Sequence, residues 1–324
     1  MTNRSITVDI LKTIGLLCVL LAHIDPPRWL YHIRVFDVCM LVFASGLTLR
    51  YHGNSIKEYL GYLVKRFKRL IVPTWIFLVV YFGVSFLLGQ RYEQWRFTPE
   101  ECVKSFVFAG GIDYIWIIRV YFLMAVISPL IVKISEWELY RKRWYLLLPG
   151  LLAVNELLGG ISNWIPTETF RKLFENCFVY TLGYSVVELM ACSVKKIKSY
   201  KLLIAVAAAF TAVWFLRGFA VPQTAKYPPQ ALYILYGLLI TLAIYYFLEK
   251  NQISMGKSRK WWVVQWCSSN SLWIYFWHIL PVTFISKMGL SDMHFLLKFG
   301  IVMAVACFLT AGQNLLRKVL LKEK

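Results

Sequence analysis

The sequence of 324 residues has few charged residues, and acidic ones are the scarcer kind. Charged residues make up 16% of the chain and hydrophobic ones 59%, with 17 Asp and Glu against 36 Lys and Arg. The seven cysteines are scattered without a CxxC pair, so neither a disulfide framework nor a cysteine metal site is expected. Heptads, low-complexity runs, clear internal repeats and a Walker-type Gly-Lys loop are missing as well. These absences argue against coiled coils, nucleotide-driven pumps and transporters built on inverted repeats.

What the sequence does contain is a series of apolar runs of about twenty residues, the length that crosses the hydrocarbon core as a helix. They predict an all-α, polytopic helical membrane protein with ten spanning helices. The connections are too short for a separate soluble domain, so residues 1–324 are expected to form one domain. The predicted spans are residues 8–25, 34–50, 70–90, 114–134, 145–161, 173–194, 202–220, 230–248, 265–287 and 294–316.

The basic residues divide unevenly between the two sides of these spans. One side holds 23 of the 36 Lys and Arg, the other holds 11, and Lys12 and Arg119 lie inside spans. The positive-inside rule therefore places both termini in the cytoplasm, and it explains the net charge of +19 without a nucleic-acid partner. The first run lacks a small-residue cleavage site, so no cleavable signal peptide is expected. The cytoplasmic set is Arg4, Arg50, Lys57, Lys65, Arg66, Lys68, Arg69, Lys133, Arg141, Lys142, Arg143, Lys195, Lys196, Lys198, Lys201, Lys250, Lys257, Arg259, Lys260, Arg317, Lys318, Lys322 and Lys324.

The first predicted span, within "SITVDILKTIGLLCVLLAHIDPP", carries Asp9, Lys12 and His23. Residues 11 or 14 apart return to nearly the same face of a helix, so the three side chains are predicted to share one stripe. Ionisable groups at membrane depth are costly and normally face the bundle interior or a wet cavity. Two readings stay open, because Asp9 and Lys12 also suit a snorkelling pair at the interface and His23 also suits an interfacial histidine.

Several motifs, taken in order along the chain, resemble the acyltransferase-3 family of membrane O-acyltransferases. They begin with Lys12, ten residues and His23, followed by "FDVCMLVFASGLTL" with its Ser45-Gly46 pair. "KRFKRLIVP" supplies an Arg-x-x-Arg as Arg66 and Arg69. "IWIIRVYFLMAVISPLI", "YPPQALYILYG" and "SLWIYFWHI" are similar to later spans of the family. Two departures are visible, since Lys12 stands where Arg is common and Asp37 stands where related sugar acetylases often carry His.

The resemblance implies an O-acyltransferase of the bacterial cytoplasmic membrane, without a metal. The expected reaction moves an acetyl group from cytoplasmic acyl-CoA, such as acetyl-CoA, to a hydroxyl of an envelope or surface glycan or its lipid-linked precursor. His23 would act as a general base or as a transient acyl carrier. Arg66 and Arg69 would bind the phosphates of the donor, or serve only as topological anchors beside anionic lipid. Lys12 would meet the same donor deeper in the membrane, or pair with Asp9.

Arg119, Glu156 and His278 also lie inside predicted spans. Arg119 is expected to hold the thioester oxygen, a carboxylate or the acceptor, or to pair with Glu156 or Asp37. Glu156, as an intramembrane acid, is a candidate for catalysis. His278 is expected to have an interfacial or helix-packing role. The competing function is a transporter or flippase of a lipid-linked sugar or glycan, which would also need polar residues in its spans.

Overall fold

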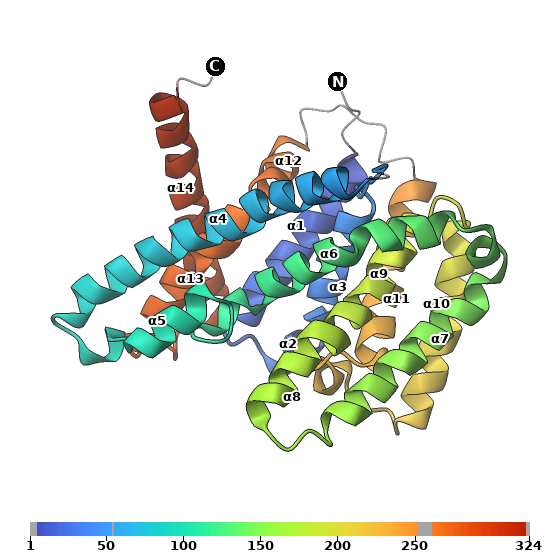
Figure 1. Ribbon diagram of the computed structural model, residues 1–324. Coiled ribbons are helices and arrows are strands. Elements are labelled where there is room, and N and C mark those ends of the chain that lie inside the picture. Colours follow the sequence, from blue (N-terminus) through green and yellow to red (C-terminus); the bar gives the residue numbers. More distant parts are fainter. Residues whose placement is uncertain (1–4, 54, 252–260, 322–324) are drawn as a thin grey trace. The chain divides into compact units, whose positions relative to one another are not determined.

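The computed structural model describes residues 5–53, 55–251 and 261–321 (Figure 1). All regular structure in these ranges is helical, which confirms the predicted all-α class. The topology prediction also used Arg4, Lys257, Arg259, Lys260, Lys322 and Lys324, which lie outside the described residues. The chain forms two compact units, and the single-domain expectation stays a prediction. The first unit is Met1–Val19, Arg28–Tyr59 and Leu123–Ser268, and the second is Leu20–Pro27, Leu60–Phe122 and Ser269–Lys324.

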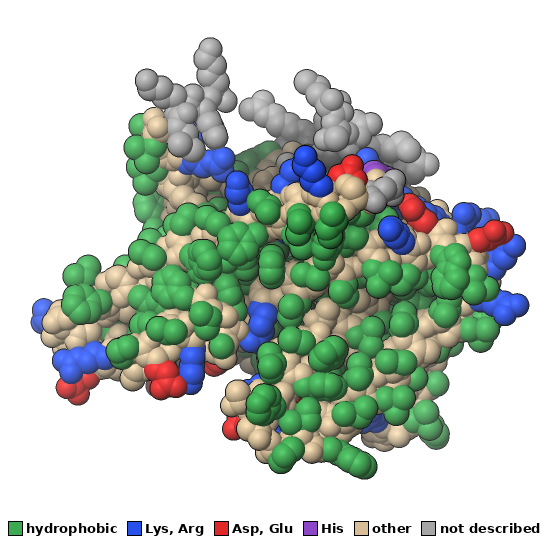
Figure 2. Space-filling view, viewed as in Figure 1, with side chains coloured by type: hydrophobic (Ala, Val, Ile, Leu, Met, Phe, Trp, Pro, Cys, Tyr) green, Lys and Arg blue, Asp and Glu red, His purple; other side chains and the backbone are tan. Residues whose placement is uncertain are grey.

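Seven helical segments of the described chain are long and apolar enough to cross a membrane, as expected for a multi-pass protein. They are Arg28–Gly46, Ile56–Gly89, Asp113–Glu136, Glu138–Ser162, Ser199–Leu216, Ala231–Lys250 and Phe295–Leu320. Figure 2 shows hydrophobic side chains over the sides of the helices, with Lys and Arg gathered where helices end. Such apolar lateral surfaces suit contact with lipid.

The other three predicted spans are helical but shorter or interrupted. Helix α1 (Ile6–Ala22) has 17 residues. The run over 173–194 is divided among α8 (Glu168–Phe174), the π-helical η4 (Glu175–Tyr180) and α9 (Thr181–Ser193). The run over 265–287 is divided between α12 (Trp262–Ser269) and α13 (Ser271–Lys287). The count of ten spans and the side of the termini therefore stay predictions.

The first unit is built around α3 (Asp37–Gly46), which packs against α9 and α11 (Ala231–Lys250) (Figure 1). Two glycines allow these helices to approach closely. A Cβ on Gly46 would lie 2.7 Å from the Ala191 Cβ, and one on Gly237 would lie 2.5 Å from the Cys39 Cβ. The Ser45-Gly46 pair thus has a packing reason, because only glycine lets α3 meet α9 at this point.

The remaining helices of the first unit surround this core. Helix α10 (Ser199–Leu216) runs beside α11 (Figure 1), and α7 (Glu138–Ser162) packs on α9. The short elements α2 (Arg28–Ile33), η1 (Arg34–Phe36) and η5 (Pro222–Ala225) lie in the connections before α3 and α11, and η1 and η5 pack against α11. Helix α6 (Trp116–Glu136) enters this unit from Leu123 onward.

The second unit combines most of α4 (Ile56–Gly89) with a helical hairpin of α13 and α14 (Phe295–Leu321). Phe77 of α4 stacks on Phe276 of α13, with ring centroids 5.1 Å apart. The Tyr81 and Thr283 hydroxyls join the same two helices by a hydrogen bond of 3.3 Å. After η2 (Glu93–Trp95) comes the short α5 (Pro99–Phe106), which begins with a capping box of Thr98 and Glu101. Helix η3 (Asp113–Ile115) then leads into α6.

Candidate functional site

His23 lies in the second unit, in a turn directly after the last residue of α1. The turn closes with a hydrogen bond of 3.1 Å from the His23 N–H to the Leu20 carbonyl. Two residues on, Asp25 has a φ of 50° in the left-handed region. The buried Lys298 ammonium of α14 lies 3.3 Å from the Asp25 carboxylate and 3.1 Å from the Ser291 carbonyl. These contacts tie the segment that carries His23 to α14.

The His23 side chain contacts a second histidine that is 255 residues away in sequence. His23 Nδ1 lies 2.9 Å from His278 Nε2, and the two rings are nearly parallel. His278 is completely buried in α13, whereas His23 is partly exposed. His278 therefore contacts the predicted catalytic residue, and its contacts are not limited to helix packing.

The hydrogen bonds of the pair determine which nitrogen of His23 is basic. His278 Nδ1 is bonded to the Tyr275 carbonyl, which can only accept, so this nitrogen carries the hydrogen. In a neutral imidazole only one ring nitrogen carries the hydrogen, so Nε2 of the buried His278 is then the acceptor. His23 Nδ1–H then donates to that nitrogen. The remaining lone pair of His23 lies on Nε2, which is the atom able to take a proton or attack an acyl group.

Two tyrosines hold this pair in place. The Tyr114 ring meets His23 edge-on, with centroids 4.8 Å apart and an interplanar angle of 85°. The Tyr275 hydroxyl donates to the Tyr114 backbone carbonyl, while the Tyr275 carbonyl accepts from His278. One residue of α13 thus orients both neighbours of His23.

Arg119 supports the loop that leads to Tyr114. Its Nη1 donates to the Phe108 carbonyl at 2.5 Å, and Phe108 has a φ of 59°. Ser105 Oγ accepts from the Ile112 N–H at 3.1 Å. At Gly111, with a φ of +80°, a Cβ would lie 1.9 Å from that same Oγ. Arg119 therefore contacts the backbone of a tight loop, and its predicted contact with substrate stays a prediction.

Arg66 and Arg69 lie one turn apart on α4, so their side chains share a face. The Arg66 guanidinium lies over the Tyr62 ring, 5.0 Å from its centroid, and Arg69 is exposed. A guanidinium fork that is held by an aromatic face and remains open to solvent is suited to phosphate. The assignment of this pair to the donor stays a prediction.

The two ionisable residues near the start of α1 belong to the first unit. Asp9 is buried and accepts a hydrogen bond of 2.6 Å from the Ser268 hydroxyl of α12. Thr13 donates to the Val264 carbonyl at 3.2 Å, so α12 packs along this part of α1. Lys12 is partly buried. The common stripe of Asp9, Lys12 and His23 and the predicted catalytic roles of these three residues stay predictions.

Glu156 links three helices of the first unit. Its carboxylate lies 2.7 Å from Arg217, just after α10, and accepts from the Ala231 N–H at the start of α11 at 2.5 Å. A carboxylate at a helix N-terminus satisfies an N–H that the helix itself leaves unpaired. These contacts give Glu156 a structural role, and its predicted part in catalysis stays untested.

A buried ionic cluster lies between the start of α3 and the η5–α11 connection. The Asp37 carboxylate lies 2.5 Å from Arg34 Nη1 and 3.0 Å from Lys226 Nζ, and all three side chains are at most 3% exposed. Lys226 could not be recognised from the sequence as part of a cluster, because a lysine next to Tyr-Pro-Pro looks like a loop residue.

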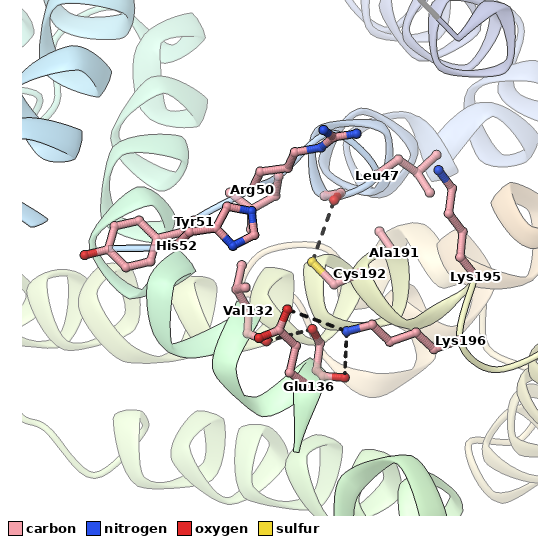
Figure 3. Close-up of a pocket in the computed structure, with 13 residues that line it drawn as sticks. Leu47, Arg50, Tyr51, His52, Val132, Glu136, Ala191, Cys192, Lys195 and Lys196 are labelled. Carbon is pink, nitrogen blue, oxygen red and sulfur yellow. Dashed lines mark hydrogen bonds and ion pairs between the residues drawn. The ribbon is translucent and has the colours of Figure 1, made fainter. Parts of the chain in front are cut away.

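A pocket of about 370 Å³ opens in the first unit where α3, α6 and α9 end (Figure 3). Arg50 and His52 come from the segment after α3, and Lys195 and Lys196 from the segment after α9. Lys196 Nζ donates to the Ser135 carbonyl at 3.3 Å and lies 3.9 Å from the Glu136 carboxylate. In the sequence, Arg50, Lys195 and Lys196 are three of the cytoplasmic basic residues, and nothing there indicates that they line one pocket.

Comparison with known proteins yields one match. A sequence profile of the acyltransferase-3 family, described as an acyltransferase domain, matches residues 6–312. No curated protein and no solved structure matches the chain.

Proposed function

Because the chain belongs to the acyltransferase-3 family and is a multi-pass membrane acyltransferase, we propose that it is an O-acetyltransferase of the bacterial cytoplasmic membrane. The donor is cytoplasmic acetyl-CoA, and the acceptor is a hydroxyl of an envelope or surface glycan or its lipid-linked precursor. The observation that carries this proposal is the hydrogen-bonded His23–His278 pair, which leaves a basic nitrogen on a family-motif histidine.

The pair supports a simple acyl transfer. The acceptor hydroxyl attacks the thioester carbonyl carbon and gives its proton to His23 Nε2. The carbon–sulfur bond then breaks, and the thiolate of CoA takes that proton and leaves as the thiol. Donation from His23 Nδ1–H to His278 keeps the imidazole oriented and shares the positive charge that develops on it. In the alternative route, His23 Nε2 first attacks the thioester carbonyl carbon, and the carbon–sulfur bond breaks to release CoA as the thiolate. The acceptor hydroxyl then attacks the acyl carbon, the bond to Nε2 breaks, and the hydroxyl proton ends on the CoA thiolate.

Arg66 and Arg69 form the proposed binding site for the phosphates of acyl-CoA. Acyl-CoA carries a diphosphate and a 3′-phosphate, and a pair of guanidinium groups on one face of α4 provides the forked donors such groups prefer. Positive-inside topology places this end of α4 in the cytoplasm, where acyl-CoA is present. The topology also places the turn that carries His23 on the opposite side, where surface glycans are found.

The test is acetyl transfer by the purified chain from labelled acetyl-CoA to envelope glycan fractions. Wild type should place label on the glycan, and His23→Ala should lose about 10²- to 10⁴-fold of the rate while remaining in the membrane. Movement of unmodified glycan across vesicles without labelling would favour the transporter instead. Unchanged transfer by His23→Ala would remove the proposed site.

Two variants and a matched control test the proposed phosphate site for acyl-CoA. Arg66→Gln and Arg69→Gln should each raise the acetyl-CoA KM about tenfold or more, because each loses a charge-assisted contact worth about 1.5–3 kcal/mol. Lys68→Gln removes the same charge from the same turn and should leave the KM near that of wild type. Equal effects at all three positions would mean that Arg66 and Arg69 act only as membrane anchors.

A further inference from the structure

The pocket at the ends of α3, α6 and α9 is not used by the proposed acyl transfer. All of its lining residues belong to the first unit, whereas His23 and His278 belong to the second. Its volume of about 370 Å³ is within the range of small-molecule sites. An open pocket of this size among cationic side chains requires an account of its own.

The charges around the pocket do not balance. Arg50, Lys195 and Lys196 bring three positive charges, and among the described lining residues Glu136 alone brings a carboxylate. Glu136 lies near Lys196, and Figure 3 shows Arg50 and Lys195 extending away from it. Within the described residues, neither Arg50 nor Lys195 forms an ion pair. The pocket therefore has two cations more than its acid can neutralise.

We propose that this pocket is a binding site for a phosphate group. Arg50 offers a forked donor, Lys195 a compact ammonium, and His52 a ring nitrogen at the same rim. The positive-inside assignment puts this rim at the cytoplasmic membrane surface. Basic pockets between spanning helices on that side are suited to anionic headgroups. The shared chemistry is a phosphate ester, which is available there from the headgroup of an anionic lipid or from a soluble phosphorylated compound.

Topological anchoring alone explains why the cations are present but not why they line a cavity. Lys198 and Lys201 satisfy the positive-inside rule from the same side, and both are exposed and outside the lining. They provide a control that removes the same charge from the same surface. Arg50 and Lys195 differ from these two lysines in lining the pocket. A binding measurement can therefore distinguish a phosphate site from topological anchoring alone.

The experiment uses the full-length chain purified in a maltoside detergent and measures the thermal unfolding midpoint. The lipid arm adds short-chain phosphatidylglycerol, and the soluble arm adds adenosine 3′,5′-bisphosphate. Because that probe carries phosphates of acyl-CoA, the soluble arm alone rests on the proposed function, and it is measured with Arg66→Gln and Arg69→Gln present in every variant so that the proposed donor site does not contribute. Ligand that binds only the folded state raises the midpoint. Arg50→Gln combined with Lys195→Gln should weaken apparent binding about a hundredfold, roughly tenfold for each lost contact.

The control combines Lys198→Gln with Lys201→Gln and should bind like wild type. The charge-preserving combination of Arg50→Lys with Lys195→Arg should retain most of the binding, which separates lost binding from lost folding. If the midpoint shift caused by phosphatidylglycerol needs Arg50 and Lys195, the ligand of the pocket is a lipid headgroup. If the shift caused by adenosine 3′,5′-bisphosphate needs them, the ligand is a soluble phosphate ester. If neither probe distinguishes the pocket variant from the control, the site does not exist. Acetyl transfer measured alongside shows separately whether the proposed function holds.

Discussion

His278 provides the sharpest test of the site, because its predicted role is to orient His23 and not to touch substrate. His278→Leu removes the acceptor of His23 Nδ1–H while leaving an apolar side chain in the fully buried position. His278→Gln keeps an acceptor, since the amide oxygen of glutamine can take the same hydrogen bond. The two variants therefore separate loss of the hydrogen bond from loss of the ring.

The size of the effect follows from the geometry. A single partly buried hydrogen bond of 2.9 Å between neutral rings contributes about 0.5–1.5 kcal/mol net, which corresponds to about 2- to 13-fold in kcat. Removal of the base itself should cost about 10²- to 10⁴-fold. We therefore expect His23→Ala to be the most severe variant, His278→Leu to be intermediate and His278→Gln to be close to wild type.

The assay is acetyl transfer at saturating donor and acceptor, with the amount of inserted protein matched. The loss in His278→Leu should appear in kcat and leave the acetyl-CoA KM unchanged, because the orienting bond does not contact the donor. The double variant of His23→Ala with His278→Leu should be no slower than His23→Ala alone, since a positioning residue has nothing left to position. The orienting role would be refuted if the fold-losses in kcat of the two single variants multiplied in the double variant. It would also be refuted if His278→Leu and His278→Gln lost kcat equally.

Two further predictions concern the packing of the first unit. Asp37→Asn leaves two buried cations without their shared carboxylate and should lower the free energy of unfolding by about 3–5 kcal/mol. Adding Lys226→Met should recover part of that loss in reversible denaturation, and the absence of any recovery would contradict the pairing. Gly46→Ala should destabilise by about 1–3 kcal/mol, because its Cβ meets Ala191. Gly159→Ala, which meets nothing within 4 Å, should be neutral or stabilising, so equal losses at both glycines would rule out the packing argument.

The helical class and most spans could be predicted from the sequence, because both depend on local composition. A run of apolar residues has few ways to satisfy its backbone in lipid except as a helix. The departures occur where helix geometry changes over a few residues. The π-helical turn at Glu175–Tyr180 divides one predicted span, and the break at Asn270 divides another. Neither position carries a proline, and hydropathy does not register a change of helix geometry. The sequence therefore did not indicate that these two spans are divided.

The pairing of His23 with His278 could not be predicted in the same way. Helical spacing relates residues within one segment, so it can place Lys12 and His23 on a common stripe but says nothing of a partner 255 positions away. One signal was present, since a histidine in an otherwise apolar and aromatic stretch is expensive unless its ring nitrogens are bonded. Lys226 gave no such signal, because it stands in a polar connection outside the spans, yet its buried ammonium requires Asp37. In a membrane chain, a polar residue inside a span is best read as evidence for an unseen partner, and for His278 the structure supplies that partner.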